Sequence, residues 1–442
     1  MKAAVRNVAI IGGGWAGCAA AVTAADNGHR VTVIEAARTL GGRARGVEID
    51  GRLLDNGQHI LLGAYSATLG LMRRVGVDPR RTLLRLPLQM RYPPGSGGMD
   101  FVAPRLPAPL HLMAALLRTS GLDRDDKLAL ARFSTSARWM AWRLNQDCTV
   151  SELLERHEQP ERLVALLWRP LCIAALNTPP DRASAQVFLN VLRDSLGARR
   201  AASDMLISRV DLSTLMPQAA SSYVAQRGGN VICGARVSSL ACDEGWRLLG
   251  GGLPEKRYDD VVIATGAPIA ASLLSGLANA PMLAAMTHEP ITTCYLEYDA
   301  SLRLAQPFYA LRDDPETGRW GQFVFDRGQL DASQSGLLAV VVSASGNAIA
   351  EGNAALTGAI ANQLAADFRM PQLANPAWCR IITEKRATFS CTPGLERPAN
   401  ATGMDGLWLA GDYTAGDYPA TLEGAVQSGI AAANLIGLRQ SR

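Results

Sequence analysis

The sequence predicts an α/β fold, and three observations support this prediction. An apolar strand at Val8–Ile11 leads into a glycine-rich turn and a helix of small residues, and a second strand follows at Arg30–Glu35. Two further buried strands end in small-residue turns, at Val261–Gly266 and at Leu407–Asp412. Strands that alternate with helices in this way are typical of a Rossmann-like domain.

The turn after the first strand has the spacing of a dinucleotide-binding loop. Gly12 permits the tight turn, Gly14 lets a pyrophosphate approach the backbone, and Gly17 lets the helix lie close to the sheet. The start of this helix offers free N–H groups and the positive end of its dipole to phosphates. Glu35 ends the second strand, where its carboxylate can accept hydrogen bonds from both hydroxyls of an adenosine ribose.

Composition sets broad limits on the protein. The 442 residues suffice for two or three domains, and 48% hydrophobic with 19% charged residues is an ordinary globular mixture. The eight cysteines are scattered without metal-ligand spacing, so we expect neither a disulfide framework nor a metal site, and a cytoplasmic location. The net charge of +4 does not indicate a nucleic-acid partner, and no uninterrupted apolar stretch is long enough for a membrane span.

Two more segments accompany the nucleotide motif and carry a family resemblance. Arg38–Arg43 contains a Gly-Gly-Arg triplet, which a hairpin-like segment and then Asp55–His59 follow. Near the C-terminus, the Gly-Asp pair is followed by Tyr418–Ala425 and a helix through Asn434. With the strands above, this set resembles the glutathione-reductase-type FAD proteins of the amine oxidase and phytoene desaturase superfamily, from end to end.

The resemblance implies FAD as the cofactor and assigns roles to particular residues. Gly42 and Arg43 would lie along the pyrophosphate and isoalloxazine, and Asp412 would accept from a ribityl hydroxyl. Thr421 is the expected N-cap of the last helix, whose first turn would face the flavin pyrimidine edge. The full expected set of cofactor contacts is Gly12, Gly14, Trp15, Ala16, Gly17, Glu35, Ala36, Gly42, Arg43, Asn56, Gly57, Gln58, Val237, Thr265, Gly266, Gly411, Asp412, Thr421, Leu422 and Ala425.

The superfamily builds its flavin domain from separate segments, with a substrate domain inserted between them. By resemblance, residues 1–84, 225–274 and 398–442 would form the FAD-binding domain. Residues 85–224 and 275–397 would form an α+β substrate domain, with strands at Leu337–Ser343 and Ile291–Tyr298 and a helical part at 109–144.

No second dinucleotide loop is visible in the sequence. Gly250–Gly252 is followed by Pro254, which favours a loop over the start of a phosphate-binding helix. A dedicated nicotinamide domain is therefore not expected, and electrons must reach the flavin through the substrate cleft or from an unidentified external donor.

The helical part carries an excess of positive charge. Between Arg73 and Arg143 there are twelve Arg and one Lys against five Asp, so this stretch carries +8. Within Lys127–Leu144, Leu130, Phe133, Ala137, Met140, Ala141 and Leu144 recur at helical spacing, while Arg132, Thr135, Ser136, Trp139 and Arg143 share the other side. Trp139 with flanking arginines indicates either a helix in a bilayer interface, which would make the protein peripheral on the inner face of the cell membrane, or a solvated helix with Trp139 in a local contact.

The middle of the chain narrows the resemblance. Trp168–Pro180, Ala183–Leu192 and Ser203–Leu212, together with Asp55–His59, look like the hydroxysqualene dehydroxylase family of bacterial hopanoid biosynthesis. That family resemblance implies reductive removal of the hydroxyl of hydroxysqualene to give squalene. A hydride from flavin N5 would quench an allylic cation, and the long isoprenoid substrate would bind through burial of apolar surface.

An acid must protonate the leaving oxygen in such a reaction, and three residues are candidates. His59 follows the expected flavin-contacting residues and titrates near neutrality if unperturbed; its alternative is a hydrogen-bonded structural histidine. Asp417 and Tyr418, which precede the last helix, are the second candidates. Arg209 and Asp211 fit better as a structural ion pair at the border of the pocket.

Three competing functions remain open at this point. A carotenoid-type desaturase would use the same fold with oxidised FAD and a polyene substrate. An amine oxidase fits less well, because that branch usually has an aromatic residue where this chain has Thr421. A membrane-associated scaffold would hold a flavin that no isoprenoid can reduce or reoxidise.

Overall fold

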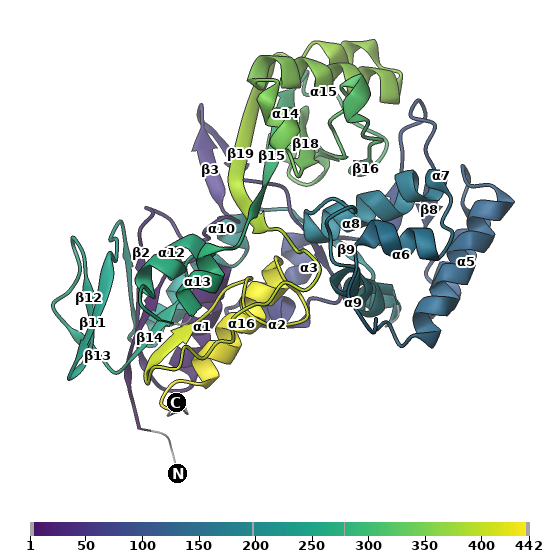
Figure 1. Ribbon diagram of the computed structural model, residues 1–442. Coiled ribbons are helices and arrows are strands. Elements are labelled where there is room, and N and C mark those ends of the chain that lie inside the picture. The colour runs from purple at the N-terminus through teal and green to yellow at the C-terminus, as the bar shows by residue number, and fades with distance from the viewer. Residues whose placement is uncertain (1–3, 197–198, 278, 439–442) are drawn as a thin grey trace.

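A computed structural model describes residues 4–196, 199–277 and 279–438 (Figure 1). Its strands and helices alternate at both ends of the chain, as the sequence predicts. The central sheet is parallel and has the order β10-β2-β1-β14-β20. Its strands are β1 (Asn7–Ile11), β2 (Arg30–Glu35), β10 (Asn230–Cys233), β14 (Asp260–Ile263) and β20 (Leu407–Leu409). The predicted Rossmann-like α/β domain is confirmed.

Three helices cover the parallel sheet. Helix α1 (Trp15–Asp26) is buried along most of its length, because its small side chains let it pack closely on α16 (Leu422–Asn434) and α11 (Pro217–Gln226). A Cβ on Gly17 would lie 1.9 Å from the carbonyl oxygen of Gly12, so only glycine fits there. The expected domain boundary between Val224 and Ala225 lies inside α11, which packs against α1. The parallel sheet with α1, α11 and α16 is named the flavin part, after the cofactor that the sequence predicts for it.

A second, antiparallel sheet stands above the first and has the order β16-β17-β18-β15-β19. Two strands are long: β15 (His288–Glu297) and β19 (Trp378–Phe389) pair along almost their whole length and run from the upper sheet down to the flavin part (Figure 1). The other strands are β16 (Phe308–Ala310), β17 (Phe323–Asp326) and β18 (Leu337–Ser343). Helices α14 (Gly346–Ala350) and α15 (Asn353–Phe368) cover the outer face of this sheet.

Smaller elements accompany these two sheets. The predicted hairpin is β3 (Gly46–Ile49) with β4 (Arg52–Asp55), and β5 (Ile60–Leu62) and β6 (Leu83–Leu86) both pair with β9 (Met205–Ser208). Gly250–Gly252 lies in the turn between β12 (Gly245–Leu249) and β13 (Arg257–Tyr258), which form a small sheet with β11 (Ser239–Asp243). The remaining elements are β7 (Gln89–Arg91), β8 (Asp100–Val102), α2 (Ser66–Arg74), α3 (Pro79–Thr82), α10 (Leu212–Leu215), α12 (Ala267–Leu273) and α13 (Asn279–Ala284).

The helical part lies on the side of the molecule away from the parallel sheet (Figure 1). It contains α4 (Leu110–Arg118), α5 (Arg124–Trp139), α6 (Val150–Arg156), α7 (Glu161–Leu163), α8 (Arg169–Leu176) and α9 (Ala185–Leu196). Among the described residues, no helix is both long and apolar enough to cross a membrane.

The predicted helical stretch 109–144 is two helices that end earlier than expected. Gly121, with φ +82°, separates them, and Asp123 and Asp126 form a capping box at the start of α5. Helix α5 ends at Trp139 because Ala141 and Trp142 take left-handed backbone conformations.

Candidate active site

The start of α1 is an open site for an anion. Gly14 is its N-cap, no side chain caps it, and its first turn holds no acidic residue. A Cβ on Gly42 would lie 3.1 Å from Cα of Gly14, so the two glycine backbones meet directly. Uncapped N–H groups beside a surface of bare backbone suit a pyrophosphate.

Glu35 lies at the carboxyl end of β2, next to this turn. Its carboxylate accepts hydrogen bonds from the backbone N–H of Gly13 at 2.6 Å and of Ala37 at 2.7 Å. The carboxylate is thereby fixed at the edge where open α/β sheets bind nucleotides. Its role toward a ribose stays a prediction.

Arg43 joins the nucleotide motif to the C-terminal Gly-Asp pair. Its guanidinium donates to Asp412 Oδ1 at 2.6 Å and to the carbonyl of Ala387 on β19 at 2.7 Å. Burial alone would lower the pKa of Arg43, but Asp412, together with Glu384 and Tyr413, outweighs burial and the pKa is raised. The Arg43 side chain keeps 37% of its surface exposed, so part of it remains accessible.

The first turn of α16 is capped as predicted. Thr421 Oγ1 accepts from the N–H of Gly424 at 3.0 Å and donates to the carbonyl of Tyr418 at 2.8 Å. The neighbouring Glu423 is fully buried, and its carboxylate accepts from the backbone N–H groups of Ala67 and Thr68 at the start of α2. This second cap could not be predicted from local sequence, because Glu423 and its partners lie more than 350 residues apart in the chain.

A buried polar network holds the Asp55–His59 segment. Arg327, in the 3₁₀ turn η4 (Arg327–Gln329) after β17, donates to Gln58 Oε1 at 3.0 Å and lies 3.8 Å from Asp55 Oδ2. Tyr295 on β15 donates to the carbonyl of Asp55 and accepts from Gln58 Nε2, both at 2.8 Å. Burial raises the pKa of Asp55 to about 6, although Arg327 opposes this shift.

His59 is half-buried, and its ring is oriented by one hydrogen bond. Nδ1 lies 2.9 Å from the carbonyl oxygen of Gly57, and because a carbonyl only accepts, Nδ1 carries the proton. Nε2 is then the free position of the neutral ring. The pKa of His59 is lowered, chiefly by burial and also by the nearby Arg43 charge, so the condition of an unperturbed ring, on which titration near neutrality depends, is not met.

Asp417 and Tyr418 lie in a different environment from His59. Asp417 is largely exposed and sits 3.6 Å from the guanidinium of Arg193 on α9. Burial raises the pKa of Tyr418, and its hydroxyl bonds to Asp194 on the same helix. Within the described residues, no hydrogen bond or ion pair connects these two residues to His59.

Arg209 and Asp211 do not form the expected ion pair in the part of the chain that the structure describes. Asp211 Oδ1 instead accepts from the N–H groups of Ser213 and Thr214 and caps α10. Arg209 is exposed.

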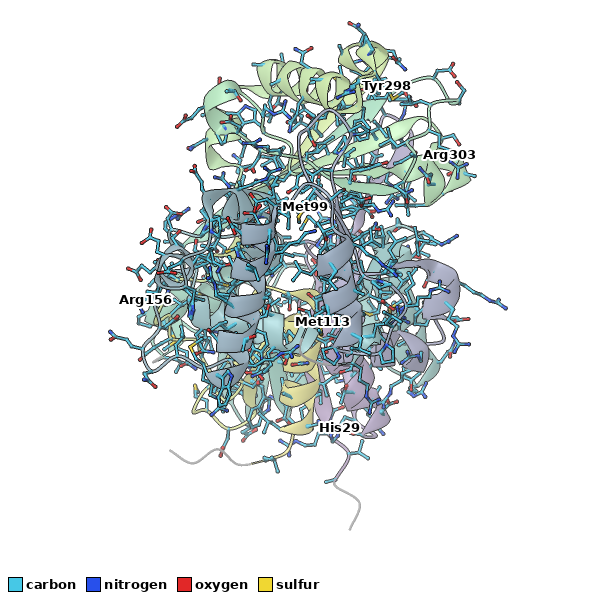
Figure 2. All side chains as sticks on the ribbon, turned by 90° about the vertical axis from the view of Figure 1, so that its right-hand side faces the viewer. His29, Met99, Met113, Arg156, Tyr298 and Arg303 are labelled. Atoms are coloured by element: carbon cyan, nitrogen blue, oxygen red, sulfur yellow. The ribbon has the colours of Figure 1, made fainter. Side chains whose placement is uncertain are left out.

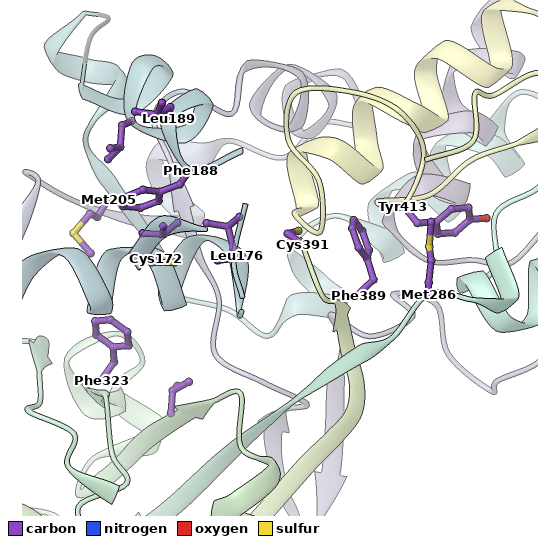
Figure 3. Close-up of a cluster of buried hydrophobic side chains, with 14 of the residues drawn as sticks. Cys172, Leu176, Phe188, Leu189, Met205, Met286, Phe323, Phe389, Cys391 and Tyr413 are labelled. Atoms are coloured by element: carbon purple, nitrogen blue, oxygen red, sulfur yellow. The ribbon is translucent and has the colours of Figure 1, made fainter. Parts of the chain in front are cut away.

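The inner face of the upper sheet forms an apolar wall. Phe308, Phe323, Phe325 and Val341 are buried there in one cluster with Tyr295, and the rings of Phe308 and Phe323 stack with centroids 5.6 Å apart. Figure 3 shows the same cluster extending from Phe323 past Cys172 and Leu176 to Phe389, Met286 and Tyr413 at the flavin part. Apolar side chains thus continue from the helical part to the expected position of the flavin.

Two small cavities lie beside other predicted contacts. Val237 lines a cavity of about 310 Å³ with Arg236, Ser238 and the first turn of α12, which follows Thr265 and Gly266. Asp412, Tyr418 and Gly424 line one of about 170 Å³. Trp15 and Ala16 are buried, so only their backbone can serve the cofactor, whereas Ala36 is exposed beside Glu35.

The residues present fit FAD. The bare start of α1 and the Gly14–Gly42 contact suit the pyrophosphate, Glu35 is held at the ribose edge, and Asp412 is fixed by Arg43 beside the start of α16. Which of these atoms touch the cofactor stays a prediction.

Comparison with known proteins supports the same identification. Residues 15–437 match the model of the family described as flavin containing amine oxidoreductase. A hydroxysqualene dehydroxylase of Rhodopseudomonas palustris is 30% identical over 98% of both chains, and a zeta-carotene desaturase of Synechocystis is 24% identical over 98% of both. The crystal structure of an oxidoreductase from Methanosarcina mazei, 15% identical, superposes with a TM-score of 0.73 over 97% of this chain and all of the other.

Proposed function

Because the chain belongs to the flavin-containing amine oxidoreductases, we propose that it is an FAD-dependent hydroxysqualene dehydroxylase of squalene and hopanoid biosynthesis. The observation that carries the proposal is the match with the Rhodopseudomonas dehydroxylase, which covers 98% of each chain and therefore includes the substrate part as well as the cofactor part.

The reaction removes an allylic hydroxyl. The C–O bond breaks as the oxygen takes a proton and leaves as water, and the carbon receives a hydride, which reduced FAD supplies when bound. The apolar wall excludes water from the positively charged carbon. It also binds the long isoprenoid chain, because each Å² of apolar surface removed from water contributes roughly 25 cal/mol.

His59 is the proposed proton donor. Its Nε2 is the free ring position, and a lowered pKa makes the protonated ring a stronger acid. Asp417 is largely exposed and pairs with Arg193, and the raised pKa of Tyr418 makes its hydroxyl a weaker acid, so His59 is preferred to both.

We also propose that the enzyme attaches to the inner face of the cell membrane through α4 and α5. Leu110, Met113 and Leu117 share an exposed face of α4, and Trp139 at the end of α5 is 86% exposed, so it makes no enclosing local contact. Figure 2 turns this side toward the viewer and labels Met113.

Charge favours anionic lipid as the partner of this surface. Six exposed arginines lie on α4 and α5 or in the chain next to them, and none of them has an ion-pair partner among the described residues: Arg105, Arg118, Arg124, Arg132, Arg138 and Arg143. Each cation near an anionic membrane surface contributes about 1 kcal/mol.

An anaerobic experiment tests the dehydroxylase. Reduced enzyme mixed with hydroxysqualene should be reoxidised with one squalene formed per flavin, while squalene added in its place should leave the flavin reduced. Since every turnover consumes two electrons, a separate electron donor must then restore the flavin.

The alternative is an isoprenoid desaturase, which the full-length similarity to the zeta-carotene desaturase favours. Two results together would favour the desaturase over the dehydroxylase. The reduced flavin would stay reduced when hydroxysqualene is added, and the oxidised flavin would be bleached when a carotene precursor is added.

A further inference from the structure

Thr293, in the middle of β15, has a buried hydroxyl without a partner. The residue is fully buried, and its Oγ1 makes no hydrogen bond within the described residues. The neighbouring Thr292 differs, because its hydroxyl points to the opposite face and bonds to Ser345 and Thr383. An unsatisfied buried hydroxyl is destabilising and calls for an explanation in terms of a ligand or function.

The position of this hydroxyl relates it to the candidate active site. A Cβ built on Gly57 would lie 3.9 Å from Thr293 Oγ1 and 3.9 Å from Cε1 of His59. The missing side chain of Gly57 therefore leaves a small space that the hydroxyl and the imidazole both face. Gly57 and His59 keep part of their surface exposed, whereas the Thr293 hydroxyl has none, so open space borders Gly57 and His59 and the hydroxyl lies next to it.

The other neighbours of Thr293 are apolar. Its partners across the sheet are Val341 on β18 and Ile382 on β19, and Phe323 follows Val341 in the same row. Tyr295, which shares this face, has its hydroxyl engaged with Asp55 and Gln58. Thr293 thus offers an uncommitted hydrogen bond in a wall that otherwise suits a hydrocarbon.

We propose that Thr293 determines specificity by hydrogen bonding to the hydroxyl oxygen of the substrate, holding that oxygen next to His59. This inference rests on the proposed function, since a long isoprenoid alcohol supplies one such oxygen in a hydrocarbon chain. The product lacks the oxygen, so squalene loses the bond and leaves Thr293 unpaired again. The residue therefore distinguishes substrate from product.

Binding of both lipids to the oxidised holoenzyme tests the inference without turnover. The change in flavin absorbance on titration gives the dissociation constants of hydroxysqualene and of squalene. We expect the wild type to bind the alcohol about tenfold more tightly, as one hydrogen bond in a buried site provides. Thr293→Val should remove this preference by weakening alcohol binding alone, and Thr293→Ser should keep it.

Stability and a matched control exclude a merely structural role. Thr293→Val has nearly the same shape and removes an unsatisfied hydroxyl, so its thermal midpoint should equal or exceed that of the wild type. Thr292→Val, the same change one residue earlier, should lower the midpoint and leave the preference intact, because that hydroxyl is bonded.

Each contrary outcome has a distinct meaning. If the wild type converts hydroxysqualene but Thr293→Val keeps the preference, the inference alone is overturned. The same holds if Thr293→Val alters flavin affinity and not the preference, because the hydroxyl would then face the cofactor. A wild type that forms no squalene overturns the proposed function and the inference with it.

Discussion

The residues of the Asp55–His59 segment are held in place by two kinds of hydrogen bond, local and long-range. His59 is oriented by a carbonyl two residues away, whereas Gln58 and Asp55 are held by Arg327 and Tyr295, which are more than 230 residues distant in the chain. The local bond fixes the tautomer of His59, and the distant bonds fix the position of the segment against the upper sheet. The acid and its support can therefore be tested separately.

If His59 is the acid, the reaction must depend on pH in a definite direction. Burial lowers its pKa below 6.5, so the protonated fraction, and with it the rate of flavin reoxidation by hydroxysqualene, should rise as pH falls below 6.5. His59→Gln should abolish this rise and slow the step about a hundredfold, which is typical of a lost general acid. Stopped-flow rates between pH 5.5 and 8 measure it, with FAD content as the control. A His59→Gln enzyme with the wild-type pH profile would show that another residue is the proton donor.

Arg327 supports the segment from outside it. Arg327→Met leaves the Asp55 carboxylate buried without its counter-ion, which costs about 3–5 kcal/mol of unfolding free energy. The pKa of Asp55 is already raised to about 6 and rises further without Arg327, so protonation relieves part of the loss at pH 6 but not at pH 8. Urea unfolding at both pH values should show the larger loss at pH 8. Arg52→Met breaks the more exposed pair with Glu297 and should cost less than about 1 kcal/mol at either pH.

At the scale of elements, the helical part departs most from what the sequence indicates. Periodicity identified the buried face of α5, and Leu130, Phe133 and Ala137 are indeed buried. It did not reveal the break at Gly121 or the end at Trp139, because these depend on backbone conformations at single residues. Four of the five parallel strands were predicted closely, since buried strands next to glycine turns carry a strong local pattern, whereas β10 at the edge of the sheet was not predicted.

The proposed membrane surface on α4 and α5 predicts lipid-dependent binding. Replacing Arg132 and Arg138 by Ser removes about 2 kcal/mol of attraction, so affinity for vesicles with anionic lipid should fall roughly thirtyfold, with little change for neutral vesicles. Vesicle flotation measures the bound fraction.

Two single substitutions of exposed apolar residues, one inside the proposed surface and one outside it, extend that experiment. Trp139→Ser should weaken binding to both kinds of vesicle, because the exposed ring inserts between lipids. Leu249→Ser changes an exposed apolar residue on β12, 43% exposed against 86% for Trp139, which lies outside the proposed surface and should have no effect. Equal losses for Trp139→Ser and Leu249→Ser would contradict the assignment of the surface.

For the whole molecule, all five histidines have a lowered pKa, and burial is the largest cause at each. Below pH 6.5 the histidines of the unfolded chain therefore bind more protons than the histidines of the native chain. The free energy of unfolding should fall as pH drops from 7.5 to 5.5, by up to about 1.4 kcal/mol per pH unit for each histidine. Asp55 opposes this with one proton, because its raised pKa makes the native state bind a proton near pH 6.

His111 on α4 allows a test of this balance. It is fully buried, and neither ring nitrogen has a partner among the described residues. His111→Leu should raise stability at pH 5.5 more than at pH 7.5 and so flatten the pH dependence, measured by urea unfolding. An unchanged slope would mean that His111 binds as many protons in the native protein as in the unfolded chain.

The sequence predicted those residues of the candidate site that belong to local motifs and missed those that act through long-range contacts. The glycine turn, Glu35, Arg43, Asp412 and the Thr421 cap belong to local motifs whose geometry follows from a few neighbouring residues. Tyr295 and Arg327 act through contacts across the fold, and a buried tyrosine or arginine carries no sequence pattern that names its partner. Thr293 is a more extreme case, because the informative fact about it is a missing bond.

The long pair β15 and β19 ties the upper sheet to the flavin part. The two strands are hydrogen-bonded to each other along almost their whole length, and at the flavin part Arg43 bonds to Ala387 while Tyr295 bonds to Asp55. A hinge motion between the two parts would have to bend this pair of strands or break those two bonds. We therefore expect the upper sheet and the flavin part to keep one arrangement through the reaction, so that the apolar wall stays in place while substrate and product exchange.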